Sequence, residues 1–464
     1  GCVIIASELF VFRKDQIKIM PPGRTDMKRK ILTLALSTAL VLSGCSYGQT
    51  GIESLLKPPK LPDQQNEIYT ALQASIGKNI TLKYPRTGDF TSAFLIANID
   101  EESTQEAIVF YEAADTVNAT MTLRINVLDQ NDGAWVSVYD AGVSAQDVDK
   151  VNFVQSNGNT FLVVGFNLAG DSGKFVVVYR YQDGRLEETA QRLTCLEYVS
   201  CNLNEDEYTE IFTITTDAKS GRRIAQAYQI SSQGSVRPMG RTDMDASVSS
   251  YRNITTGKLA DGRQAVYLDG LSGTNRYTTE VLTYENGSLY NLLYSAAGEK
   301  SFIEETVRSD AIFSADIDAD GVIEIPTRVA ASGYEDAASH EQEYFTLWNI
   351  CTEDGLEVKK TSYVAYTLGF LFTIPDKWLG RVTPVFSSAE NELTFYRYDG
   401  GMEPTARLLS IRVFRSSEFR EGISGYTTLR DNGQIIYAQK IYDDDKSLQL
   451  DSETVQSCFS LYTQ

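Results

Sequence analysis

The chain has 464 residues, of which 42% are hydrophobic and 22% charged, so it is globular by composition and long enough for two or three domains. Its formal net charge is −20 at pH 7, and so acidic a surface repels nucleic acid, which excludes nucleic-acid binding as a function. A single histidine and the lack of a Cys-x-x-Cys pair make a zinc site unexpected.

Residues 27–44 have the order of an export signal. Met27 is followed by three basic residues, an apolar run over 31–42 and the small residues Ser43 and Gly44. A charged, an apolar and a small-residue region in this order indicate a secretory signal peptide. The apolar run is shorter than the roughly 20 residues that a transmembrane helix needs, so we do not expect it to remain as a span.

Leu42-Ser43-Gly44-Cys45 resembles the lipobox of bacterial lipoproteins. The resemblance implies that the thiol of Cys45 takes a diacylglyceryl group and that this cysteine becomes the new N-terminus. The protein would then be extracytoplasmic and held on the bacterial cell membrane by lipid. The alternative is an ordinary secretory signal followed by a cysteine that has no such role.

Residues 1–26 precede this signal and begin with glycine, and we interpret them as a non-native upstream extension with Met27 as the true start. Removing residues 1–44 deletes seven basic and three acidic residues, a net of +4, so the formal charge changes from −20 to −24.

Residues 45–63 are polar and punctuated by proline, as in Lys57-Pro58-Pro59, and this composition predicts a tether between the membrane and a folded domain. Residues 64–84 are predicted to be a short helix and a lead-in to the first strand. Asp63 can cap a helix that ends near Ile76 and carries apolar residues on one face.

A repeated motif follows, with Asp or Asn at its first and third places and Glu at its ninth. Two weaker copies, from Asn157 and Asp261, keep the turn and the strand after it. The three full copies are Asn98/Asp100/Glu106, Asn202/Asn204/Glu210 and Asp316/Asp318/Glu324.

Each unit continues with two more strand-like runs around a turn, such as 182–184 or 285–287. Four short strands in a repeat of about 50 residues are typical of a propeller blade. We therefore predict a mainly β fold, with a β-propeller of about five four-stranded blades over residues 85–366. A sixth blade would need residues 68–85 or part of the tail, and a stack of β-sandwiches is the alternative.

Residues 367–464 have a different pattern and are predicted to form a small α+β C-terminal domain. Strand-like runs at 392–396, 408–414 and 435–441 are interrupted by a predicted helix at 417–421, and an amphipathic run at 452–461 ends the domain. The cysteines of the folded part, Cys195, Cys201, Cys351 and Cys458, are expected to be free thiols, most of them buried.

The copy that starts at Asp316 is the candidate metal site. Its carboxylates at places one, three, five and nine, with Gly321 at the sixth, can converge on a hard cation such as Ca²⁺. The twelfth place is Thr327, so this is not an EF-hand. The alternative is that the side chains accept hydrogen bonds from the turn's own amides without an ion. We favour that alternative for the other two copies, which contain neutral amides.

The pattern resembles the calcium loops of FG-GAP or VCBS-like propeller repeats. The resemblance implies metal ligation by Asp316, Asp318, Asp320 and Glu324.

We interpret the chain as a cell-surface lipoprotein with a non-catalytic binding or scaffolding surface. Its partners would be the membrane, through the lipid on Cys45, and an unknown protein or glycan ligand. His340 is interpreted as a surface polar residue. The alternative function is an envelope glycan hydrolase that uses carboxylates in the propeller channel, since paired carboxylates can cleave glycosidic bonds.

Overall fold

The described part of the chain begins just before helix α3 (Asp63–Ile76). The computed structural model describes residues 62–100, 102–114, 121–170, 173–189, 191–295, 301–338, 341–401 and 405–462. The signal peptide, Cys45, most of the predicted tether and His340 lie outside these residues. Within them, no helix is long and apolar enough to cross a membrane.

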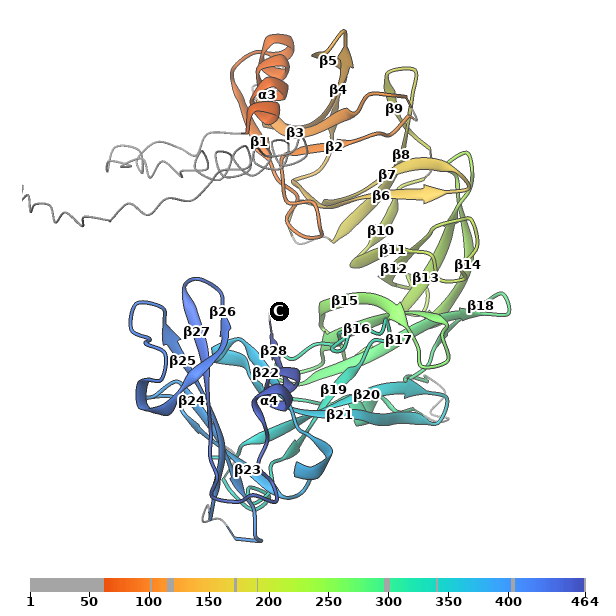
Figure 1. Ribbon diagram of the computed structural model, residues 1–464. Coiled ribbons are helices and arrows are strands. Elements are labelled where there is room, and N and C mark those ends of the chain that lie inside the picture. Colours follow the sequence, from red (N-terminus) through yellow and green to blue (C-terminus); the bar gives the residue numbers. More distant parts are fainter. Residues whose placement is uncertain are drawn as a thin grey trace, which may run out of the picture. The chain divides into compact units, whose positions relative to one another are not determined.

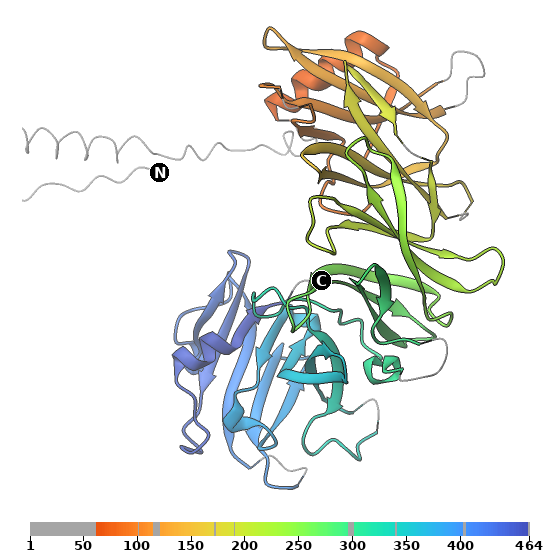
Figure 2. The same cartoon turned by 90° about the vertical axis from the view of Figure 1, so that its right-hand side faces the viewer.

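Helix α3 is confirmed at the predicted position. Ile68 and Leu72 are fully buried, as their spacing on one face requires. The helix contacts β4 (Met121–Asn131) and β5 (Ala134–Val143) of the first sheet (Figure 2).

Six antiparallel sheets make up the described residues, in chain order (Figure 1). The first contains β1 (Ile80–Lys83), β2 (Phe94–Ala97), β3 (Glu106–Ala114), β4 and β5. The second contains β6 (Asp147–Ser156), β7 (Asn159–Asn167), β8 (Lys174–Gln182), β9 (Arg185–Glu188) and β10 (Leu193–Cys195). The third contains β11 (Glu197–Cys201), β12 (Glu210–Thr216), β13 (Arg223–Ile230) and β14 (Val236–Asp243).

The fourth sheet contains β15 (Ser250–Lys258), β16 (Gln264–Leu271), β17 (Tyr277–Glu285) and β18 (Ser288–Asn291). The fifth contains β19 (Ile325–Ala330), β20 (Tyr344–Thr352), β21 (Gly355–Ala365), β22 (Phe370–Thr373) and β28 (Phe459–Leu461). The sixth contains β23 (Val382–Ser387), β24 (Glu392–Arg397), β25 (Arg407–Arg415), β26 (Thr427–Asp431) and β27 (Ile435–Ile441). Short helices η1 (Ile303–Thr306), η2 (Tyr366–Leu368), η3 (Asp376–Trp378), η4 (Ile423–Gly425) and α4 (Ser452–Cys458) connect strands.

The first five sheets correspond to the five predicted repeat units. The repeated turn joins β2 to β3, β6 to β7, β11 to β12 and β15 to β16, and in the fifth sheet Ala315 bridges to Glu324 across it. The predicted turns at 182–184 and 285–287 are present, with Asp183 and Asn286 at positive φ followed by glycine. The fold is therefore mainly β and built from consecutive sheets of the kind that forms propeller blades.

Internal sheets are buried on both faces. Along β7, Leu162, Val164 and Phe166 pack into a core shared with the first sheet, while Phe161 and Val163 pack into a core shared with the third. This is the period of two that a strand imposes, with apolar residues on both faces. The third and fourth sheets share a further core, and so do the fourth and fifth.

A glycine permits one of these close approaches. A Cβ atom at Gly165 would lie 2.3 Å from a ring carbon of Tyr198, so only glycine leaves room for this ring between the second and third sheets. The Tyr198 hydroxyl donates to the carbonyl oxygen of Lys150 at 2.9 Å, and the Lys150 ammonium donates to the Tyr198 carbonyl at 2.7 Å. The ring and these two bonds fix the spacing of the sheets.

A buried ion pair links the fourth sheet to the segment that leads into the fifth. Arg308 Nη2 lies 2.7 Å from Asp269 Oδ1, with both side chains almost fully buried. Asp269 also accepts hydrogen bonds from the Thr279 hydroxyl, the Ser314 amide and the Asn253 amide group. Removal of either charge would leave the other buried without a partner, which is strongly destabilising.

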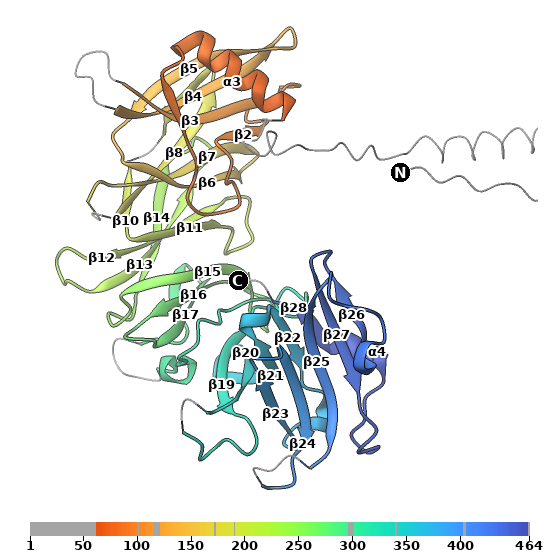
Figure 3. The same cartoon turned by 90° about the vertical axis from the view of Figure 1, so that its left-hand side faces the viewer.

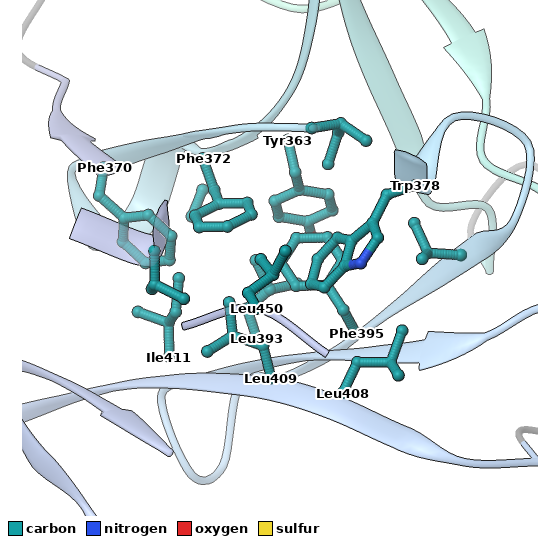
Figure 4. Close-up of a cluster of buried hydrophobic side chains, with 14 of the residues drawn as sticks. Tyr363, Phe370, Phe372, Trp378, Leu393, Phe395, Leu408, Leu409, Ile411 and Leu450 are labelled. Carbon is teal, nitrogen blue, oxygen red and sulfur yellow. The ribbon is translucent and has the colours of Figure 1, made fainter. Parts of the chain in front are cut away.

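The C-terminal residues contribute to two sheets. Strand β22, which follows the predicted domain boundary at 366, pairs with β21, and β28 from the chain end pairs with β22 (Figure 3). The sixth sheet shares one large core with the fifth, in which Phe372, Trp378 and Phe395 lie together (Figure 4). Residues 85–366 and 367–464 thus meet through strand pairing and through a common core.

Two local predictions need correction. The helix predicted at 417–421 is wrong, because these residues form turns in the connection between β25 and β26. The predicted amphipathic run at 452–461 is helical only over α4 and then extends as β28. The expectation that the four cysteines are free thiols is confirmed, but only Cys195 and Cys351 are buried, whereas Cys201 and Cys458 are half-buried.

Candidate functional site

The repeated turns of neighbouring sheets contact one another. In an antiparallel sheet, the turns after the first and the third strand lie at the same end of the strands. We call the end that carries the repeated turns the turn edge. Its contacts join Asn157 N to Glu207 O (2.5 Å), Gln264 Nε2 to Glu205 Oε1 (3.1 Å) and Lys258 N to Gly321 O (2.8 Å).

The ninth place of each full repeat holds its turn in the same way. The glutamate there is buried at the start of the strand that follows the turn or, for Glu324, directly before it, and its Oε2 atom accepts the backbone N–H of the residue at place two. The donors and distances are Ile99 to Glu106 (2.7 Å), Leu203 to Glu210 (2.9 Å) and Ile317 to Glu324 (3.0 Å). The conserved spacing within the chain therefore has a structural role in all three turns.

Burial makes two of these glutamates unusual acids. Desolvation raises the pKa of Glu106 and of Glu210 to about 7, although the hydrogen bonds from Ile99 and Leu203 act in the opposite direction. The Oε1 atom of each is buried and has no hydrogen-bond partner within the described part of the chain. At neutral pH each carboxyl group is therefore partly protonated.

The turn of the third full repeat, residues 316–324, is bound by the ammonium group of a lysine from β21. Lys359 Nζ donates to Glu324 Oε1 at 2.6 Å, to Asp320 Oδ2 at 2.7 Å and to Asp318 Oδ1 at 3.2 Å. A second ammonium, that of Lys360, lies 2.7 Å from Asp318. Three of the four predicted metal-ligating residues thus converge on one point, and that point is occupied by Lys359.

Asp316 has a different role. Its Oδ1 accepts the amide of Asp320 at 3.2 Å and its Oδ2 accepts the amide of Gly321 at 2.8 Å, so it stabilises the turn together with Glu324. These are hydrogen bonds of the kind that the sequence offered as the alternative to metal binding.

The charged groups of this turn shift one another's pKa values. Burial alone would lower the pKa of Lys359, but its hydrogen bonds to Asp320, Glu324 and Asp318 outweigh burial and raise it. The hydrogen bond from Lys359 lowers the pKa of Asp320, while desolvation raises the pKa of Glu324. The ammonium therefore stays protonated at neutral pH and balances the carboxylates.

The donor set also suits calcium. Ligand oxygens of Asp316, Asp318 and Glu324 lie within 4.8 Å of one another, and carboxylate oxygens are the ligands that Ca²⁺ prefers. A calcium ion at this point would have to displace the Lys359 ammonium. Sequence reasoning missed this lysine because it lies on β21, brought to the turn by strand pairing, and no local pattern marks it.

A pocket lies beside the first turn, between the first and second sheets, with a volume of about 370 Å³. The second sheet contributes the turn that follows β8, including Tyr181 and Asp183. From the first sheet come Asp100 and Glu102 of the repeated turn and Asp129 of β4. The repeat analysis identified the turns that carry Asp100, Glu102 and Asp183, but Asp129 and Tyr181 belong to no motif.

No family model matches the sequence, and no curated protein is similar to it. Among solved structures, the chain is similar to a periplasmic gluconolactonase of Pseudomonas aeruginosa, with 14% sequence identity, a TM-score of 0.30, and coverage of 70% of this chain and 86% of the other. A TM-score this low supports no conclusion on activity.

The raised pKa values predict that stability depends on pH. Glu106 and Glu210 shift from 4.5 to about 7 on folding, so between these values the folded protein holds protons that the unfolded chain has released. The stabilising contribution is complete below about pH 4.5 and is lost as the pH rises through about 7. We expect the urea midpoint to fall over this range in the wild type, and to fall less in the double variant Glu106→Gln/Glu210→Gln.

Glutamine keeps a carbonyl oxygen for the turn amide and carries no charge at any pH. Glu357→Gln, at an exposed residue of β21, is the matched control and should follow the wild-type curve. Parallel curves for the wild type and the double variant would contradict the assignment.

The lysine in the third turn predicts a calcium response that depends on Lys359. Lys359→Met leaves three carboxylates facing one another, so we expect a lower melting temperature than in the wild type. Millimolar Ca²⁺ should raise the melting temperature of this variant more than that of the wild type, because the ion can then enter without competition. Thermal melts with Ca²⁺ and with chelator measure both effects.

Lys360→Met is the control, since Lys360 contacts Asp318 alone among the carboxylates of this turn. An equal calcium shift in wild type and Lys359→Met would show that Lys359 does not compete. No shift in either would remove calcium from this turn.

Proposed function

We propose that the protein is an extracytoplasmic lipoprotein, held on the bacterial membrane by lipid on Cys45. The folded residues from Asp63 onward would act as a non-catalytic binding or scaffolding module. The signal at 27–44 and the Leu42-Ser43-Gly44-Cys45 sequence support the anchor. Two or more acyl chains give stable anchoring where one chain does not, so a lipidated N-terminus would keep the module at the membrane.

The turn edge is the observation that carries the binding role. Because both faces of the internal sheets are buried in shared cores, a ligand reaches these sheets at their edges only. Carboxylates recur along the turn edge, and in the first three sheets Asp100, Asp183 and Asp206 form no ion pair with a described residue. The edge is thus suited to a partner that presents positive charge.

The behaviour of the buried glutamates supports a binding module over the alternative, a glycan hydrolase. Glycosidases place two carboxyl groups roughly 5 to 10 Å apart on either side of the substrate. Glu106 has the raised pKa of a general acid and lies near Asp100 and Asp129, which is the observation that favours the hydrolase. Its side chain, however, is fully buried and bonded to the turn amide, away from any substrate.

We infer that a calcium ion would bind the turn of Asp316, Asp318, Asp320 and Glu324 only when Lys359 moves away. The turn is then stable with either cation.

Replacement of Cys45 should remove the anchor. In cells that express the chain from Met27 and are fed a labelled fatty acid, we expect the wild type to take up label and to sediment with membranes. Cys45→Ser should do neither, because the serine hydroxyl is not the nucleophile that the lipidation reaction uses. Cys458→Ser, a half-buried cysteine of the folded part, is the control and should keep the label. Label on Cys45→Ser would contradict lipidation at this residue.

A photo-crosslinking amino acid at Glu207, exposed in the third sheet's repeated turn, should capture a partner on intact cells. The same amino acid at Lys219, exposed in the turn at the opposite edge of that sheet, should capture less. Equal capture at both positions would contradict a binding role for the turn edge. Release of reducing sugar ends from envelope glycans by the purified protein would instead favour the hydrolase.

A further inference from the structure

The pocket beside the first turn combines open volume with a lining that is rich in carboxylates. Asp100, Glu102, Asp129 and Asp183 line it, and none of them forms an ion pair with a described residue. Arg180 is the single basic residue of the lining, and its Nη1 atom donates to Gln233 Oε1 at 3.1 Å. Four carboxylates and one guanidinium leave the lining with a net charge of −3.

A buried hydroxyl without a partner points to a ligand. Tyr181 lines the pocket although only 6% of the residue is exposed, and its ring packs in the core shared by the first two sheets. Its hydroxyl oxygen is buried and has no hydrogen-bond partner among the described residues. Burial, with the nearby charges of Asp129 and Glu106, raises the pKa of Tyr181, so the hydroxyl stays neutral. Leaving such a group unpaired costs free energy, and a ligand atom would recover it.

The spacing of the carboxylates argues against a metal ion here. In the described residues, the three carboxylates close enough to hold one ion are those of the turn 316–324, and none lines this pocket. A volume of about 370 Å³ also lies within the range of small-molecule pockets and far exceeds the space of a single ion. Dispersed negative charge and hydroxyl groups instead match an organic cation with several hydrogen-bonding groups.

We propose that this pocket binds an organic cation that carries a primary ammonium group. The ammonium would lie among the four carboxylates, and the Tyr181 hydroxyl would accept from or donate to the ligand at the floor of the pocket. An amino sugar, a polyamine and a lysine side chain of a peptide all offer this chemistry. This inference rests on the proposed binding role of the turn edge and names the class of ligand that it takes.

Calorimetry on the full-length protein in detergent tests the proposal with glucosamine, spermidine and a lysine-containing peptide as separate probes. We expect at least one of them to bind, and glucose and N-acetylglucosamine, which lack the ammonium group, to bind at least about tenfold more weakly. Binding should weaken as salt is added. The probe that binds most tightly identifies the source of the ammonium group.

Variants assign the binding to this pocket. Asp129→Asn/Asp183→Asn should weaken binding by about tenfold or more, because two charges are lost while the Asp129 acceptor for the Gln130 amide is kept. Tyr181→Phe removes the hydroxyl alone and should weaken binding severalfold. Glu357→Gln, on the exposed side of β21, should leave binding unchanged, and circular dichroism checks that each variant is folded.

Failure of all three probes to bind, or equal binding by wild type and the Asp129/Asp183 variant, would overturn the proposal. Capture of a partner at Glu207 on cells would keep the binding role of the turn edge even then. Absence of capture together with absence of probe binding would overturn both.

Discussion

Burial of both faces of the internal sheets is the constraint on which the rest of the structure depends. Once Leu162 and Phe161 on one strand serve two different cores, neither face of the second sheet is available to solvent or to a ligand. Polar chemistry is then confined to the edges, where turns join the strands. The repeated acidic motif lies in this place in the first, third and fifth sheets, and the pocket beside Tyr181 opens there too.

The same constraint explains why the buried polar groups between the sheets form so many hydrogen bonds. Asp269 and Arg308 are both nearly inaccessible, and the aspartate accepts four further hydrogen bonds from side-chain and backbone donors in addition to its ion pair. The glutamate at the ninth place of each full repeat accepts a turn amide, and in two of the three turns its other buried oxygen has no hydrogen-bond partner among the described residues. These oxygens are tolerated because a carboxyl with a pKa near 7 can be neutral.

The three repeated turns differ mainly in how their charge is balanced. The carboxylates of the turn at 316–324 are partly balanced by Lys359 and Lys360, both from β21 of the same sheet. In the first turn, Asp100 forms no ion pair with any lysine of the described residues and instead faces a pocket with a net negative lining. Turns that look alike in sequence are therefore unlike in electrostatics, and the one with the weaker metal-like pattern is the one that offers open space to a ligand.

The sequence by itself determined the helix from Asp63, the mainly β class, the repeat units and the position of each repeated turn. These features depend on periodicity, on turn residues and on spacing along the chain, which are local. Tertiary structure alone decided that β22 and β28 complete the fifth sheet, that Lys359 meets Asp318, Asp320 and Glu324, and that Tyr181 lies beside Asp129. Each of these contacts joins residues far apart in the chain through strand pairing or sheet packing, and no local pattern records which strands will become neighbours.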